Sequence, residues 1–132
     1  MLKILLVDDD AGSLRGLALA LKMLKHSCDA FCNPLDAWES FKNVSYDVVL
    51  TDICMPGLNG IQLGNRIKQL RSDACILYMS GQLSGTVAEK LLNKGKPVCL
   101  IRKPIEFNEL RAVLNRTIIQ DNAEGVKNGS RV

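Results

Sequence analysis

Five polar residues with a capacity for chemistry stand just after short apolar runs of the sequence. They are Asp8, Asp9, Asp52, Ser80 and Lys103, and the runs before them cover residues 2–7, 47–50, 75–79 and 98–101. Near-continuous apolar runs of this length are typical of strands buried on both faces of a parallel sheet. Because ligands of an open parallel sheet bind outside the carboxyl ends of its strands, all five residues fall where such a site is expected.

The charges of these residues predict a divalent cation at the site. Asp8, Asp9 and Asp52 carry three negative charges, and Lys103 offsets one of them. Carboxylate oxygens are hard ligands that suit Mg²⁺ (or Mn²⁺), and a divalent ion would neutralise the charge that remains. Asp10 is not needed there, because an acid at this position can cap the next helix and stabilise its positive end.

An aspartate beside such a cation is suited to phosphoryl transfer. A carboxylate is ionised near neutral pH and can attack phosphorus without a general base. Lys103 and the metal would neutralise charge on the phosphoryl oxygens, and the hydroxyl of Ser80 would donate a hydrogen bond to the product. Taken singly, each residue has an ordinary alternative, because Asp52 can be a turn residue, Ser80 a cap and Lys103 an exposed lysine.

The elements that must position these residues alternate regularly along the chain. The apolar runs predict four strands, and the more polar stretch at 27–31 predicts a fifth strand at an edge of the sheet. Apolar residues at helical spacing predict five helices, from Leu14 to Leu24, at 33–41 with Asn33 as N-cap, from Ile61 to Leu70, from Val87 to near Gly95, and at 106–120. Five β–α units predict an α/β fold with a doubly wound, flavodoxin-like parallel sheet of order 2-1-3-4-5. In that order the first and third strands are neighbours, so Asp8, Asp9 and Asp52 converge.

The composition indicates a single soluble domain. Of 132 residues 47% are hydrophobic and 23% charged, and the polar stretch at 122–132 is predicted to be a flexible tail behind a domain at 1–121. The net charge of +3 is scattered along the chain, which argues against direct binding of nucleic acid. Nothing approaches the ~20 apolar residues of a membrane span, and the start does not read as a signal peptide. We therefore expect a cytoplasmic protein that makes no membrane contact.

The cysteines are predicted to be free thiols. There are five of them, an odd number, and no two form a C-x-x-C pair. Cys28 and Cys32 would lie about 13 Å apart on one extended strand, which is too far for a disulfide. Buried or idle thiols are favoured over a zinc site.

Four stretches, in this order and at this spacing, resemble the receiver domain of two-component response regulators. They are "LLVDDD" at 5–10, "VVLTDICMPGLNG" at 48–60, "ILYMSG" at 76–81 and "LIRKP" at 100–104. The resemblance covers about residues 2–120. One such motif is a weak signal, but four together at the right separations are highly specific.

The resemblance implies a role for each acidic residue. Asp52 would be the residue that accepts the phosphoryl group. Asp9 and Asp52 would bind Mg²⁺ directly, together with the backbone carbonyl of Cys54, and Asp8 would bind it through water. These assignments agree with the metal site that the charges predict.

The resemblance also implies how the signal is generated. Ser80 matches the switch hydroxyl and Lys103 the lysine that contacts the phosphoryl group, with a cis peptide bond before Pro104. Receivers generally carry Tyr or Phe three residues before that lysine, whereas this chain has Leu100. We therefore expect Leu100 to stay packed in both states, while residues 80–94 carry the conformational difference.

As a function, the resemblance implies a stand-alone receiver that acts as a phosphorylation-dependent switch or phosphorelay intermediate. Its partners would be a sensor histidine kinase or histidine phosphotransfer protein and an unknown downstream protein. It would not be an enzyme beyond Mg²⁺-dependent self-phosphorylation and autodephosphorylation.

Two other classes of protein stay open. One is a phosphorylation-independent adaptor of the same fold, which the leucine at position 100 favours. The other is an aspartate-nucleophile phosphatase of the haloacid-dehalogenase type. That class normally carries its nucleophile after the first strand and usually has a cap domain, whereas Asp52 follows the third strand here.

Overall fold

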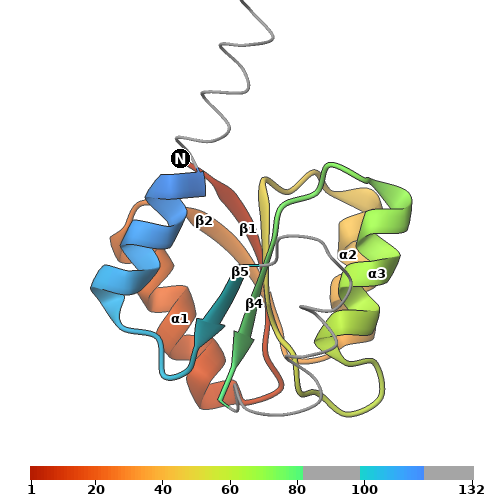
Figure 1. The fold of residues 1–132 in the computed structure, drawn as a ribbon, viewed down its shortest axis with the longest axis horizontal. Coiled ribbons are helices and arrows are strands. Elements are labelled where there is room, and N and C mark those ends of the chain that lie inside the picture. The colour runs from red at the N-terminus through yellow and green to blue at the C-terminus, as the bar shows by residue number, and fades with distance from the viewer. Residues whose placement is uncertain (82–98, 118–132) are drawn as a thin grey trace, which may run out of the picture.

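A computed structural model describes residues 1–81 and 99–117 of the chain. Five parallel strands form one sheet in the order β2-β1-β3-β4-β5 (Figure 1). The strands are β1 (Lys3–Val7), β2 (Ser27–Phe31), β3 (Val48–Asp52), β4 (Ile76–Ser80) and β5 (Cys99–Arg102). The predicted flavodoxin-like order is confirmed, and the polar stretch that was predicted at an edge is β2.

Helices cover both faces of the sheet. They are α1 (Ala11–Met23), α2 (Pro34–Asn43) and α3 (Gly60–Leu70), and residues 107–117 are also helical. Helix α1 and residues 107–117 lie on one face, and α2 and α3 lie on the other (Figure 1). The helix predicted between Val87 and Gly95 lies outside the described residues.

The helix starts follow the local sequence signals. Asp10 is the N-cap of α1, where its carboxylate accepts a hydrogen bond from the N–H of Gly12 at 3.1 Å. Asn33 caps α2 in the same way, with Pro34 in the first turn, so both predicted caps are confirmed. Helix α3 begins with a reciprocal capping box between Asn59 and Gln62.

Each face of the sheet has its own hydrophobic cluster. On one face Leu21 and Leu114 pack against the sheet, and on the other Phe41 and Leu63 do so. Strands β3 and β4 are buried along their whole length, as the apolar runs predicted. Both strands also run further than predicted, so that Asp52 and Ser80 are their last residues, because Asp52 still pairs with Met79 and Ser80 with Arg102 in the sheet.

Two further features bear on the expectations from the sequence. All five cysteines are free thiols, as predicted. Among residues 1–81 and 99–117, no helix has the length and apolar character that crossing a membrane requires.

Candidate functional site

Three acidic side chains meet at the carboxyl edge of the sheet. Strands β1 and β3 are neighbours, with Val7 opposite Thr51, so the residues that follow this pair come together. Carboxylate oxygens of Asp8, Asp9 and Asp52 lie within 4.8 Å of one another. Asp8 is fully buried and Asp52 is 7% exposed, whereas Asp9 is open to solvent. The cluster therefore has a buried floor and one exposed acid at its rim.

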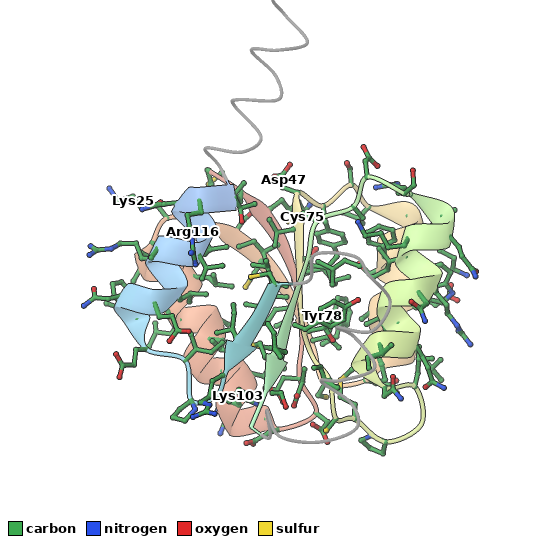
Figure 2. The ribbon with its side chains drawn as sticks, viewed as in Figure 1. Lys25, Asp47, Cys75, Tyr78, Lys103 and Arg116 are labelled. Atoms are coloured by element: carbon green, nitrogen blue, oxygen red, sulfur yellow. The ribbon has the colours of Figure 1, made fainter. Side chains whose placement is uncertain are left out.

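Lys103 places a positive charge between the two buried carboxylates. Its ammonium group donates hydrogen bonds to Asp8 Oδ2 at 2.7 Å and to Asp52 Oδ2 at 3.3 Å. The main chain holds the lysine in place, because its N–H donates to the carbonyl of Ser80 at 2.9 Å. The Lys103–Pro104 peptide bond is cis, as the resemblance implied. Figure 2 shows Lys103 at the carboxyl end of β5.

The two buried carboxylates are stabilised to different degrees. Burial by itself would raise the pKa of Asp8, but hydrogen bonds from Lys103 and from the N–H of Asp10 hold it below its ordinary value. Burial raises the pKa of Asp52, and the neighbouring charge of Asp8 adds to this, against the opposing effect of Lys103. Burial likewise opposes the charge of Lys103, but its bonds to both aspartates raise its pKa above the ordinary value.

The main chain around Asp52 contributes to the site as well. The N–H of Cys54 donates to Asp52 Oδ1 at 3.4 Å, so each oxygen of this carboxylate faces a donor. The side chain of Cys54 is exposed beside it. The predicted use of the Cys54 carbonyl as a metal ligand stays a prediction.

Ser80 and Leu100 lie on the strands next to this cluster. Ser80 is the last residue of β4 and is 2% exposed. It follows Met79, the residue of β4 that pairs with Asp52 of β3. Leu100 is partly buried on β5 and packs against the hydrophobic cluster between the sheet and helices α2 and α3. It is therefore packed in this structure, and its predicted behaviour on phosphorylation stays a prediction.

One residue at the site was missed by the reasoning from sequence. Gly60, the first residue of α3, lies so close to β3 that a Cβ atom there would come within 2.0 Å of the Asp52 carbonyl oxygen. Its N–H also donates to the carbonyl of Ile53 at 2.8 Å. The signal was the glycine directly after the capping residue Asn59, where the close approach of two backbones excludes a side chain.

The donor set fits a divalent metal ion. Three carboxylates whose oxygens lie within 4.8 Å of one another offer the hard oxygen atoms that such ions prefer. Lys103 offsets only part of their charge, so the electrostatics of the cluster as well as its ligand type are consistent with a divalent cation.

This fold, with an acidic cluster and a lysine at the carboxyl edge of the sheet, is that of a signalling receiver domain. The family model described as the response regulator receiver domain matches residues 4–115. The chain therefore belongs to the response regulator receiver family of two-component signalling.

Similar sequences come from several kinds of signalling protein. The DNA-binding transcriptional regulator NtrC of Azospirillum brasilense is 34% identical over 115 residues, which are 87% of this chain and 24% of that protein. The receiver protein CpdR of Brucella abortus is 33% identical over 81 residues, 61% of this chain and 68% of that protein. The chain spans about a quarter of the length of NtrC from either of two organisms.

Solved structures agree in fold. A receiver domain protein from Clostridium thermocellum superimposes with a TM-score of 0.82 at 23% identity, over 93% of this chain and 98% of that one. The response regulator TrrA of Thermotoga maritima, solved in complex with Mg²⁺–BeF, gives a TM-score of 0.78 at 26% identity, over 89% of this chain and 99% of that one.

Proposed function

We propose that this chain accepts a phosphoryl group on Asp52 and acts as a phosphorylation-dependent switch or phosphorelay intermediate. The observation that carries the proposal is the setting of Asp52, whose carboxylate meets Lys103 on one oxygen and shares a 4.8 Å cluster with Asp8 and Asp9. Membership of the receiver family supports the same function.

The phosphoryl donor is a phosphohistidine on a sensor histidine kinase or a histidine phosphotransfer protein. An oxygen of the Asp52 carboxylate forms a bond to phosphorus as the bond between phosphorus and the histidine nitrogen breaks. The electron pair of that bond leaves with the imidazole, which takes up a proton. No general base is required, because the attacking carboxylate is already ionised near neutral pH.

The residues around Asp52 stabilise the transferred group. Mg²⁺ (or Mn²⁺), when bound, supplies positive charge for the phosphoryl oxygens, and Asp9, Asp52 and the carbonyl of Cys54 would hold it, with Asp8 acting through water. Lys103 is within reach of Asp52 and turns toward the added oxygens as a second positive charge. Ser80, at the end of the adjacent strand, donates its hydroxyl hydrogen to the product.

The consequence of phosphorylation is a change of charge at a buried edge of the sheet. A phosphoryl group brings about −1.5 to −2 of charge to a site that already holds buried carboxylates. Lys103 and Ser80 respond to that charge, which shifts a two-state equilibrium in the loops nearby. A downstream protein then binds one of the two states, or a second phosphotransfer protein takes the phosphoryl group onward.

The test is to locate the acyl phosphate. The chain is incubated with a small acyl phosphate and Mg²⁺, trapped with borohydride and mapped by mass spectrometry. We expect the label on Asp52, and none in Asp52→Asn, which keeps the shape of the residue but removes the nucleophile. Labelling that survives this substitution excludes Asp52 as the acceptor, and partner binding that is indifferent to the label favours the adaptor function.

A further inference from the structure

Helix α3 carries two glycines, one turn apart, on its buried face. Gly60 and Gly64 are both buried, and each lies against a different strand of the site. At Gly60 a Cβ atom would be 2.0 Å from the carbonyl oxygen of Asp52 and 2.8 Å from the Cα of Ile53. The start of α3 therefore rests directly on the main chain of the proposed phosphoacceptor.

At Gly64 the helix rests on a tyrosine of β4. A Cβ atom at Gly64 would be 2.1 Å from the hydroxyl oxygen of Tyr78, 3.0 Å from its Cζ and 3.2 Å from its Cε1. Tyr78 is 7% exposed and points from β4 toward the face that carries α2 and α3 (Figure 2). The hydroxyl of Tyr78 thus occupies the space that a side chain at position 64 would fill.

Tyr78 is linked to the site along its own strand. It stands two residues before Ser80, and side chains two apart on a strand point to the same face of the sheet. Across the sheet it pairs in register with Leu100, which packs against the same hydrophobic cluster. Burial also raises the pKa of the Tyr78 hydroxyl, so the group lies against the helix as a neutral phenol.

A methyl group at position 64 has two ways to be accommodated, and both reach the site. If α3 moves outward, the shift is transmitted to Gly60, about 6 Å along the same rigid helix, and so to the main chain of Asp52. If the ring of Tyr78 moves instead, the shift is transmitted along β4 to Ser80.

We propose that the Gly64–Tyr78 contact is a positioning contact, which fixes α3 on the sheet so that Gly60 holds Asp52, and β4 holds Ser80, in the geometry that phosphoryl transfer needs. The proposal rests on the proposed function, since it names residues that set up that same site. Neither residue touches the reacting atoms, so both act through Asp52 and Ser80.

The test compares Gly64→Ala, Tyr78→Phe and the double variant in the full chain. We expect Gly64→Ala to slow labelling of Asp52 by a small acyl phosphate about tenfold or more, because ångström-scale misplacement of reacting groups can cost about a hundredfold. Tyr78→Phe removes the atom that the new methyl group would meet, leaving Cζ at 3.0 Å, which a shift of a few tenths of an ångström relieves. The double variant should therefore regain the rate to within about threefold, a rescue that the loss of an ordinary core contact would not show.

Two controls separate positioning from stability. Gly16→Ala changes a helical glycine of α1 around which a Cβ atom meets nothing within 4 Å, so the rate should not change. Val113→Ala weakens the core on the opposite face of the sheet, so it should lower the unfolding temperature but not the rate while the chain stays folded.

A second readout does not depend on phosphorylation. Amide shifts of Asp52 and Ser80 in the metal-free chain should move in Gly64→Ala, return in the double variant and stay unchanged in Gly16→Ala. If the wild type is not labelled at Asp52 yet these shifts behave as described, the proposed function fails and the positioning contact stands. A Gly64→Ala variant that is labelled at the wild-type rate overturns the positioning proposal. So does a double variant that does not fold, or that folds without recovering the rate.

Discussion

Lys103 interacts unequally with the two buried aspartates. It is closer to Asp8, at 2.7 Å, than to Asp52, at 3.3 Å, and only Asp8 has a pKa held below its ordinary value. The raised pKa of Asp52 means that its charge is the less well compensated of the two. Groups whose environments push their pKa values apart take different roles. Asp8 is suited to stay ionised as the fixed partner of the lysine, and Asp52 to be the carboxylate that reacts.

Asp9 is the acid whose removal should weaken metal binding with the least damage to the fold. It is exposed, and its carboxylate supplies one of only three clustered negative charges. We expect Asp9→Ala to lower Mg²⁺ affinity by about tenfold or more, or about 1.4 kcal/mol. Calorimetric titration measures this, and Asp73→Asn, which removes an exposed acid outside the cluster, is the matched control. Equal affinities in wild type and Asp9→Ala would mean that the metal binds elsewhere.

Lys103→Ala should have the opposite effect on the metal. Without the ammonium group the clustered carboxylates are more negative, so Mg²⁺ affinity should hold or rise, by up to about tenfold. The same variant should accept a phosphoryl group poorly, because the transferred oxygens lose a positive charge. Titration and acyl phosphate labelling of one sample separate the two effects. A variant that loses both metal and phosphoryl group would contradict this division of roles.

At the scale of elements, the end of α1 departs from what sequence favours. The helix closes with the N–H of Lys25 donating to the carbonyl of Lys22 and the N–H of His26 donating to that of Leu21. This Schellman arrangement needs a left-handed residue, and Lys25 fills that position with φ 65°, where glycine is usual.

Lys25→Gly should therefore stabilise the chain. A non-glycine residue in the left-handed region costs about 1 kcal/mol or more, and glycine avoids this cost. Because glycine also loses more backbone entropy on folding, we expect a net increase of about 0.5–1 kcal/mol in the free energy of unfolding. The matched control is Lys22→Gly, in the last turn of the same helix, which should cost up to about 1 kcal/mol. Urea unfolding measures both. A loss of stability in Lys25→Gly would show that the lysine side chain contributes something the backbone geometry does not.

The same turn holds a titratable link to β1. Nδ1 of His26 accepts a hydrogen bond from the N–H of Leu2 at 3.0 Å, and only the unprotonated nitrogen can accept. Burial, with a smaller effect of the N-terminal charge, holds the pKa of His26 below its ordinary 6.5.

Stability should therefore fall as this histidine is protonated. Because the folded pKa lies below the unfolded one, the contribution of His26 is complete above about pH 6.5 and is lost as the pH falls through the folded pKa. His26→Asn keeps an acceptor near the position of Nδ1 and does not titrate. We expect urea unfolding between pH 7.5 and pH 5 to show a steeper loss in wild type than in the variant. Parallel profiles would exclude His26 as the titrating group.

How far the sequence predicts the structure differs among these elements. The apolar runs, the caps at Asp10 and Asn33, and the polar edge strand follow from local patterns, so order and topology could be predicted. The ends of β3 and β4 could not, because they depend on pairing between strands rather than on hydrophobicity.

Around the site too, features that follow from strand order could be predicted from the sequence, whereas individual tertiary contacts could not. The convergence of Asp8, Asp9 and Asp52 followed from strand order alone. The contacts of Gly60 and Gly64 could not be predicted, since a glycine in the sequence does not say which backbone or side chain will approach it. The hydrogen bond of His26 was missed for a similar reason, because its partner is 24 residues away.

For the molecule as a whole, the clustered carboxylates have two opposite effects. Their like charges oppose folding, and the same charges are what a bound metal ion requires. The three carboxylates lie at the ends of two strands that are more than forty residues apart in sequence, so the cluster forms only in the folded chain. A ligand that binds the folded chain and not the unfolded one stabilises it by mass action, by about 2.7 kcal/mol at a concentration one hundred times its Kd. In a domain of this size that is an increase of roughly 10 °C in Tm.

The last prediction uses Asp52→Asn to separate the cost of the carboxylate charge from the stabilisation by bound Mg²⁺. Because the folded pKa of Asp52 is raised, its ionised form costs stability at pH 7, a cost that shrinks as the pH falls through the folded pKa and is gone only below the ordinary pKa of an aspartate. The neutral amide removes this cost, so metal-free Asp52→Asn should melt above metal-free wild type at pH 7. It also removes a proposed metal ligand, so we expect Mg²⁺ to raise its Tm far less than that of wild type, whereas Asp73→Asn should respond to Mg²⁺ as wild type does. Calorimetry with and without Mg²⁺ gives all the values. A metal-free variant that melts below wild type would mean that the Asp52 charge is already compensated in the empty fold by Lys103 and the N–H of Cys54.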